Sequence, residues 1–155
     1  MQHSLNLFDI SAIGHLLGGW TVMFLAGAQV DSEVFSHGCH LHPNPRICGV
    51  GREMNLMTPV APRLNQSLRD PRIKRVVSLD LGLAHSFSMQ SLAKVRIPVL
   101  ILGAGVDIGD LPEDKEFGFL ARHLPARLTQ YIVFENAAHF SFLQLCKPNA
   151  SVLLN

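Results

Sequence analysis

The stretch that decides the fold is FDISAIGHLLGGWTVMFLAGA, residues 8–28. Its first part, 8–14, is a short apolar run that ends in glycine, which is typical of a strand buried on both faces. From residue 17 to residue 28 the composition becomes compatible with a helix. Three residues at fourfold spacing fall on one face of that helix: Trp20, Phe24 and Ala28. The stretch therefore predicts a strand, a sharp turn and a helix.

The rest of the chain divides into an irregular part and a regular part. Residues 31–70 are polar and rich in His, Pro and Asn, and we expect an irregular excursion there with a short helix near 52–57. After residue 70, strands and helices are expected to alternate, with strands at 73–79, 98–103 and 130–135 and helices at 89–94, 113–124 and 140–145. Such alternation predicts an α/β fold with a mostly parallel sheet of about four strands and helices on both of its faces.

Length and composition restrict the class of protein. The chain has 155 residues, of which 48% are apolar and 16% are charged. These values exclude disorder and predict a single domain, 1–155, with a real core. The formal net charge is +1, which provides no electrostatic footprint for nucleic acid or for an anionic membrane. We therefore expect neither as a partner.

Residues 10–30 are almost uncharged and long enough for a membrane span. They also contain Ala26-Gly27-Ala28, which resembles a signal-peptidase site. Against both interpretations, no Lys or Arg precedes the run, Asp9 stands where a positive region belongs, and His15 interrupts it. The sequence favours a strand, turn and helix outside the membrane, and a cytoplasmic chain as it stands.

The turn itself reads Gly14-His15-Leu16-Leu17-Gly18. A glycine-flanked turn from a strand into a helix is the geometry of a nucleophile elbow, whose pattern is Gly-x-Ser-x-Gly. There the residues two positions from the centre must be small, and Gly14 and Gly18 meet that requirement. Position 16 is leucine, which has no nucleophilic atom, so covalent acyl transfer cannot begin there. Taken alone, the turn is equally consistent with a glycine-rich connection that has no function.

Two further candidates follow the later strands. Asp107 lies after the strand at 98–103, and His139 lies after the strand at 130–135. The order elbow, acid, histidine is that of α/β-hydrolases, in which the histidine is general base and then general acid while the aspartate fixes its tautomer. Asp110 is a rival for the acid. The structural alternatives are a turn aspartate and a packed histidine.

A resemblance to a family extends over nearly the whole chain. Gly14-His15-x-x-Gly18-Gly19 and the helix after it look like the elbow of bacterial predicted dienelactone hydrolases, relatives of platelet-activating-factor acetylhydrolase. Three motifs continue the resemblance in register: DPRIK at 70–74, IPVLI at 97–101 and AHFSF at 138–142. It implies an α/β-hydrolase fold, hydrolysis of a small ester or lactone, and no cofactor. It also implies Asp107 as acid, His139 as base and the Leu17 N–H as an oxyanion-hole donor.

Two departures from the family bear on activity. Leu16 stands at the serine position, and the family has several strands ahead of the elbow, with the second oxyanion donor on a loop among them. We therefore expect the C-terminal part of an α/β-hydrolase that is inactive as it stands, although the sequence leaves open whether the chain is an enzyme. The alternatives are one chain of a split hydrolase and a non-catalytic binding protein. An exposed edge on the elbow strand would predict self-association or pairing with another chain.

The cysteines and histidines of the excursion allow two interpretations. The five residues concerned are His37, Cys39, His40, His42 and Cys48. They are zinc-ligand types, but their spacing matches no paired zinc motif, and no metal site is predicted. The resemblance suggests instead an excursion over the mouth of the active site. In an oxidising compartment Cys39 and Cys48 would close a loop and leave Cys146 free. The disulfide state stays open here, and relatives of this type are often exported.

Overall fold

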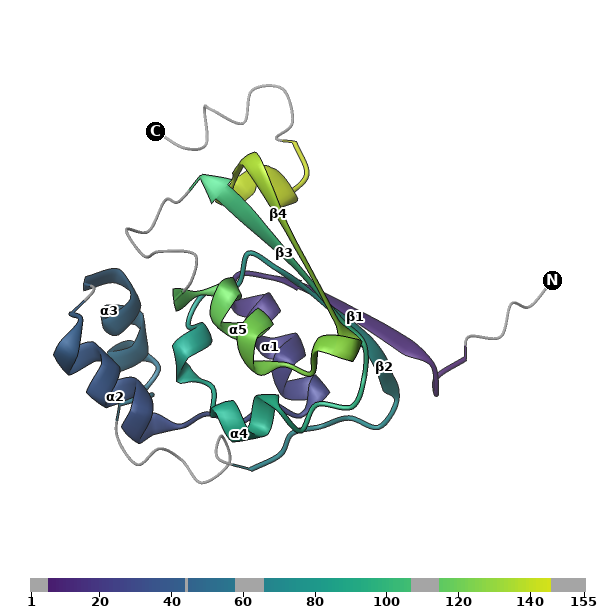
Figure 1. The fold of residues 1–155 in the computed structure, drawn as a ribbon, viewed down its shortest axis with the longest axis horizontal. Helices are drawn as coiled ribbons and strands as arrows, with labels where there is room; N and C mark the ends of the chain where they lie inside the picture. The colour runs from purple at the N-terminus through teal and green to yellow at the C-terminus, as the bar shows by residue number, and fades with distance from the viewer. Residues whose placement is uncertain (1–5, 44, 58–65, 107–114, 146–155) are drawn as a thin grey trace.

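A four-stranded, all-parallel sheet organises the chain, and its strands lie side by side in sequence order (Figure 1). The computed structural model describes residues 6–43, 45–57, 66–106 and 115–145. The strands are β1 (Ile10–His15), β2 (Ile73–Leu79), β3 (Val99–Val106) and β4 (Thr129–Ala138). The expected α/β class with a parallel sheet is confirmed.

The helices connect these strands. They are α1 (Leu17–Ala26), α2 (Ser32–Leu41), α3 (Pro45–Glu53), α4 (Met89–Leu92) and α5 (Phe117–His123), with the short 3₁₀ helices η1 (Ala84–Ser86), η3 (Ala126–Leu128) and η4 (His139–Phe142). Residues 10–30 form β1, α1 and the segment that leads to α2, as the preferred interpretation of that run predicts. Within the described ranges, no helix combines the length and apolarity needed to span a membrane.

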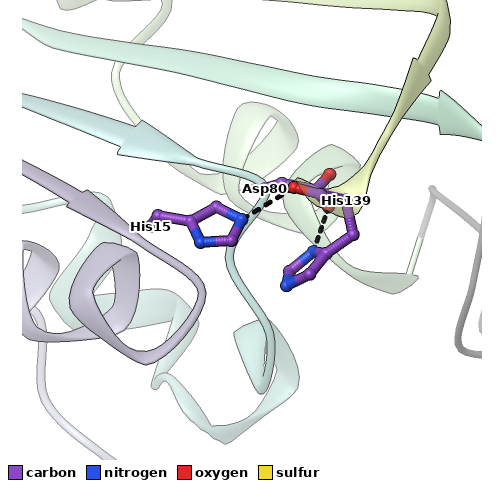
Figure 2. Close-up of side chains that lie close together, drawn as sticks. All are labelled: His15, Asp80 and His139. Carbon is purple, nitrogen blue, oxygen red and sulfur yellow. Dashed lines mark hydrogen bonds and ion pairs between the residues drawn. The ribbon is translucent and has the colours of Figure 1, made fainter. Parts of the chain in front are cut away.

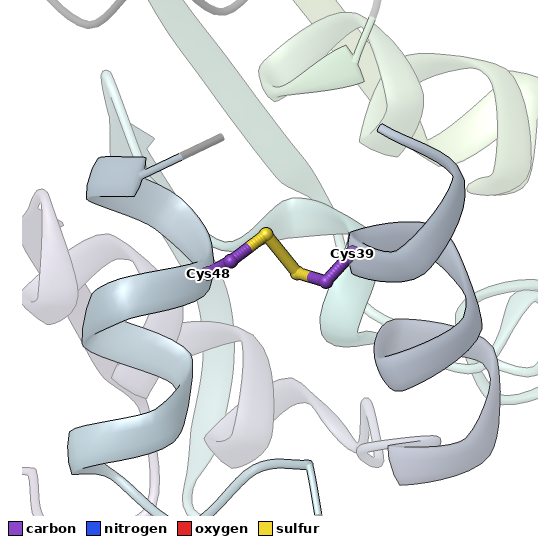
Figure 3. The surroundings of a disulfide bond; sticks show 2 residues. All are labelled: Cys39 and Cys48. Atoms are coloured by element: carbon purple, nitrogen blue, oxygen red, sulfur yellow. A yellow bond between two sulfur atoms is a disulfide. The ribbon is translucent and has the colours of Figure 1, made fainter. Parts of the chain in front are cut away.

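The excursion is more regular than its composition predicts. Where irregular chain was expected, the structure forms the two helices α2 and α3. A disulfide between Cys39 and Cys48 joins these helices, and the Cα atoms of the two cysteines are 5.8 Å apart (Figure 3). The helix expected near 52–57 is wrong, because α3 ends at Glu53. Asp31 caps α2 by accepting a hydrogen bond from the Val34 N–H at 3.0 Å. This cap and the buried Phe35 stabilise a helix that the polar composition obscures.

The core lies between one face of the sheet and helices α1 and α5 (Figure 1). Trp20, Phe24 and Phe87 form an aromatic cluster beneath α1, with ring centroids 4.5 to 5.9 Å apart. The Trp20 indole N–H donates to the Ser86 hydroxyl at 2.8 Å, so its polar group is satisfied within the core. Trp20, Phe24 and Ala28 are all buried, but α1 ends at Ala26, so Ala28 lies beyond the helix on which it was expected.

The second face of the sheet is apolar and largely uncovered in the described part of the chain. Helices were expected on both faces, but α1 and α5 contact the same face (Figure 1). Two rows of paired residues cross the second face, Ile13–Val77–Leu100 and Leu79–Leu102–Ile132. Ile13 is 66% exposed and Ile132 is 46% exposed. Parallel sheets are normally covered on both faces, so this surface is available for a contact.

Candidate functional site

The turn between β1 and α1 holds Leu16 in an unusual backbone conformation. Its φ and ψ are 53° and −116°, a region that costs a residue with a side chain on the order of 1–3 kcal/mol. Hydrogen bonds fix it there, because the Leu16 N–H donates to the Leu79 carbonyl at 3.1 Å and the Leu16 carbonyl accepts from the Trp20 N–H at 3.1 Å. The turn therefore has the sharp, strained geometry that its glycines predict.

Close packing explains two of the glycines of the turn. A Cβ on Gly14 would lie 2.0 Å from the Gly18 carbonyl oxygen, and a Cβ on Gly19 would lie 2.8 Å from the Leu81 Cβ. The steric reason expected for Gly18 is wrong, because a Cβ at that position meets nothing within 4 Å. The constraint falls on Gly19 instead, since α1 packs closely on the segment after β2.

A buried histidine–carboxylate pair lies at the same end of the sheet. His139 Nδ1 lies 2.5 Å from Oδ2 of Asp80 (Figure 2), and both side chains are 9% exposed. A carboxylate only accepts, so Nδ1 carries the hydrogen and donates it. The second carboxylate oxygen, Oδ1 of Asp80, accepts the Ala104 N–H at 2.8 Å. The pair is therefore oriented from two sides.

The sequence did not single out Asp80. Asp107, the expected acid, and its rival Asp110 lie outside the described residues, whereas the carboxylate that contacts His139 belongs to Asp80. The available signal was the position of Asp80 directly after β2, since the carboxyl ends of parallel strands form one edge of the sheet. Choosing between two aspartates that each follow a strand requires the path of the chain around His139.

His15, expected only as a member of the turn, also contacts His139. Its Nε2 lies 2.9 Å from the His139 carbonyl oxygen, and the two rings have centroids 4.3 Å apart (Figure 2). The last residue of β1 is thereby attached to the residue that follows β4, although β1 and β4 are not neighbours in the sheet.

A cavity of about 410 Å³ opens beside these residues. Leu16, Leu17, Asp80 and His139 line it together with apolar residues from three elements: Ile47 and Val50 of α3, Val106 of β3 and Phe117 of α5. Its volume lies within the range of small-molecule sites, which is about 300–1,000 Å³. The cavity can accommodate a small, largely apolar ligand next to the histidine–carboxylate pair.

Backbone strain and a helix terminus both occur at this cavity. Four described residues other than glycine have a positive φ, and three of them line the cavity: Leu16, Asp80 and Leu83. Strained conformations of this kind concentrate at functional sites. Leu17 is the first residue of α1, and within the described residues its N–H has no acceptor. This N–H is the expected oxyanion donor, and the helix dipole adds partial positive charge there.

The cysteines of the excursion are joined to each other, so neither is a free thiolate for zinc. The disulfide holds α3, which carries one wall of the cavity, against α2. Cys146 lies outside the described residues.

Comparisons with models of protein families, with curated proteins and with solved structures found no match to this chain. The functional argument therefore depends on the fold and on the geometry of the cavity.

Proposed function

We propose that this chain is the C-terminal part of an α/β-hydrolase of the dienelactone hydrolase-like type. In this proposal it binds a small ester or lactone in the cavity and does not cleave it by an acyl-enzyme route. The observation that carries the proposal is the backbone of Leu16. Its φ of 53° and ψ of −116° occur between a parallel strand and a helix, at the wall of a cavity that also contains His139. This is the place and the strained geometry of a nucleophile elbow.

The histidine–carboxylate pair supports the same proposal. In a hydrolytic triad the aspartate accepts from Nδ1 of the histidine, and Nε2 then serves the nucleophile and the leaving group. His139 and Asp80 have the first of these contacts. In this proposal Asp80 replaces Asp107 as the triad acid, and the Leu17 N–H is one donor to an oxyanion.

Leucine at position 16 removes the first chemical step. A triad requires a hydroxyl or thiol whose proton the histidine accepts, and the Leu16 side chain contains only carbon and hydrogen. Without that group, Nε2 of His139 can accept a hydrogen bond from a water molecule, but the pair cannot form an acyl-enzyme. The proposal therefore gives the natural chain a binding role and assigns ester hydrolysis to its family.

Ligand binding without turnover tests this function. We expect phenyl acetate and δ-valerolactone to bind saturably to the full chain, measured by chemical-shift changes in NMR spectra, with no product detected by chromatography. Val50→Trp fills the cavity from α3 and should abolish binding. Val34→Trp, on the exposed face of α2, is the matched control and should bind normally. Turnover by the natural chain, or binding that Val50→Trp leaves unchanged, would refute the proposal.

The edge strand β1 favours self-association as a second function. In the described part of the chain β1 pairs only with β2, and Ile13 projects from it with 66% of its surface exposed. Two copies related by a twofold axis can place their β1 edges together, because such an interface is self-complementary. Pairing of this kind satisfies the backbone groups of the β1 edge and places a side chain of the second copy beside Ile13.

A further inference from the structure

Three side chains with metal-binding donor atoms meet beside the cavity. His15 ends β1, Asp80 follows β2 and His139 follows β4 (Figure 2). Each offers one donor atom, and these atoms all lie within 4.8 Å of one another. The parallel topology produces this convergence, because it brings the carboxyl ends of separate strands to one edge.

Hydrogen bonds to backbone groups hold the side chains of Asp80 and His15 in place. Oδ1 of Asp80 accepts the Ala104 N–H at 2.8 Å, which fixes the carboxylate from the side away from His139. His15 contacts the His139 carbonyl oxygen at 2.9 Å through Nε2. Hydrogen bonds of this kind orient the ligands of metal sites and contribute to their affinity.

Two side chains of the cluster are buried and also line the cavity. Asp80 is 8% exposed and His139 is 7% exposed, and both line the cavity of about 410 Å³. Leu16 cannot hydrogen-bond to His139, and within the described ranges Nε2 of His139 has no hydrogen-bond partner. The cluster offers a cation one carboxylate and two imidazoles.

We propose that His15, Asp80 and His139 form a binding site for a divalent transition-metal ion, with Zn²⁺ as the best fit. Imidazole nitrogens favour such ions over Mg²⁺ and Ca²⁺. Two histidines, one carboxylate and a water molecule are a known ligand set for tetrahedral zinc. A zinc–nitrogen distance of about 2.0–2.1 Å separates tetrahedral donors by about 3.3–3.4 Å. The three side chains therefore draw together from their present separation of at most 4.8 Å when the ion binds.

Metal binding and acid–base chemistry exclude each other at this site. A His139 nitrogen that binds the ion cannot accept a proton, and the neutral imidazole keeps its one hydrogen on its other nitrogen. This metal site goes beyond the proposed binding of esters and does not depend on it, because its donors are the side chains themselves.

Equilibrium dialysis against Zn²⁺, with the bound metal quantified by mass spectrometry, tests the site. The full chain is used with His37→Ala, His40→Ala and His42→Ala, which remove exposed histidines at α2. We expect about one ion per chain, and a loss of affinity of at least about tenfold in His15→Gln and in Asp80→Asn. His123→Gln is the matched control, since His123 contacts the Phe119 carbonyl on α5, and it should bind as before.

Two further measurements make the result independent of folding defects. Far-UV circular dichroism must be unchanged in each variant, and Co²⁺ used as the probe should give intense visible bands of tetrahedral type that His15→Gln removes. Failure of the folded chain to bind either ion overturns the proposal. Unchanged binding after both His15→Gln and Asp80→Asn overturns it as well. Neither result bears on ester binding, which is measured in metal-free buffer.

Discussion

Asp80 and His139 are 59 residues apart in the chain, and their side chains lie 2.5 Å apart at the carboxyl edge of the sheet. This contact joins the segment after β2 to the segment after β4 across the intervening strand β3. It places an oriented imidazole on a cavity whose other wall includes Leu16.

The first prediction concerns which aspartate serves His139. In a Leu16→Ser background, Asp80→Asn should slow labelling by a fluorophosphonate by about 10⁴-fold, the order of magnitude seen when an amide stabilises the wrong histidine tautomer. Asp107→Asn in the same background should label at the parental rate. The measurement is the rate of adduct formation by intact mass. The opposite ranking of the two variants would return the acid role to Asp107.

The glycines of the turn provide a second prediction. Gly14→Ala should lower the free energy of unfolding by at least about 1–3 kcal/mol, because the new methyl group collides with the Gly18 carbonyl. Gly18→Ala should be neutral or stabilising by up to about 1 kcal/mol, since it places alanine in a helix with space around it. Urea denaturation followed by circular dichroism measures both. Equal losses in the two variants would contradict the packing described for the turn.

The aromatic cluster beneath α1 provides a third prediction. Phe87 is fully buried between Trp20 and Phe24, so Phe87→Ala should cost about 3–5 kcal/mol of unfolding free energy. Met89→Ala, two residues further on and 50% exposed, is the control and should change stability by no more than about 0.5 kcal/mol. Chemical denaturation distinguishes the two outcomes, and a small effect of Phe87→Ala would mean that the core is packed differently.

A fourth prediction concerns acid titration. Hydrogen bonds from the Arg72 guanidinium and backbone lower the pKa of Asp70 from 3.8 to about 2. Because the folded pKa lies below the unfolded value, the contribution to stability is present above pH 3.8 and is lost as the pH falls towards 2. Arg72→Gln should raise the Asp70 pKa towards 3.8, as measured by NMR titration of the carboxyl carbon. An unchanged midpoint would show that the pair does not persist in solution.

Self-association gives a fifth prediction. Ile13→Lys places a charge on the exposed edge strand and should shift the sedimentation coefficient towards that of a monomer, because a charge on an edge strand opposes pairing with another edge. Val34→Lys, on the exposed side of α2, is the control and should sediment like the natural chain. A natural chain that is monomeric at every concentration tested would exclude the interface at β1.

Local sequence patterns were sufficient to predict the strands, but they were not sufficient to predict which residues form the candidate site. The run at 73–79 predicted β2 with its observed bounds, because an apolar strand between polar neighbours has a clear periodicity. Helix α2 was missed, since its stability depends on the Asp31 cap and on burial of Phe35 rather than on composition. Asp80 was missed for a similar reason: its contact with His139 spans 59 residues, and no local pattern encodes it.

The central claim is that Asp80, His139 and the turn at Leu16 are arranged to support a nucleophile at position 16, and that leucine there prevents formation of an acyl-enzyme. Fluorophosphonate labelling of the natural chain and of Leu16→Ser, read by intact mass, tests it most directly. The account predicts no adduct on the natural chain and a stoichiometric adduct at position 16 of the variant. An adduct on the natural chain, or a folded variant that stays unlabelled, would contradict it.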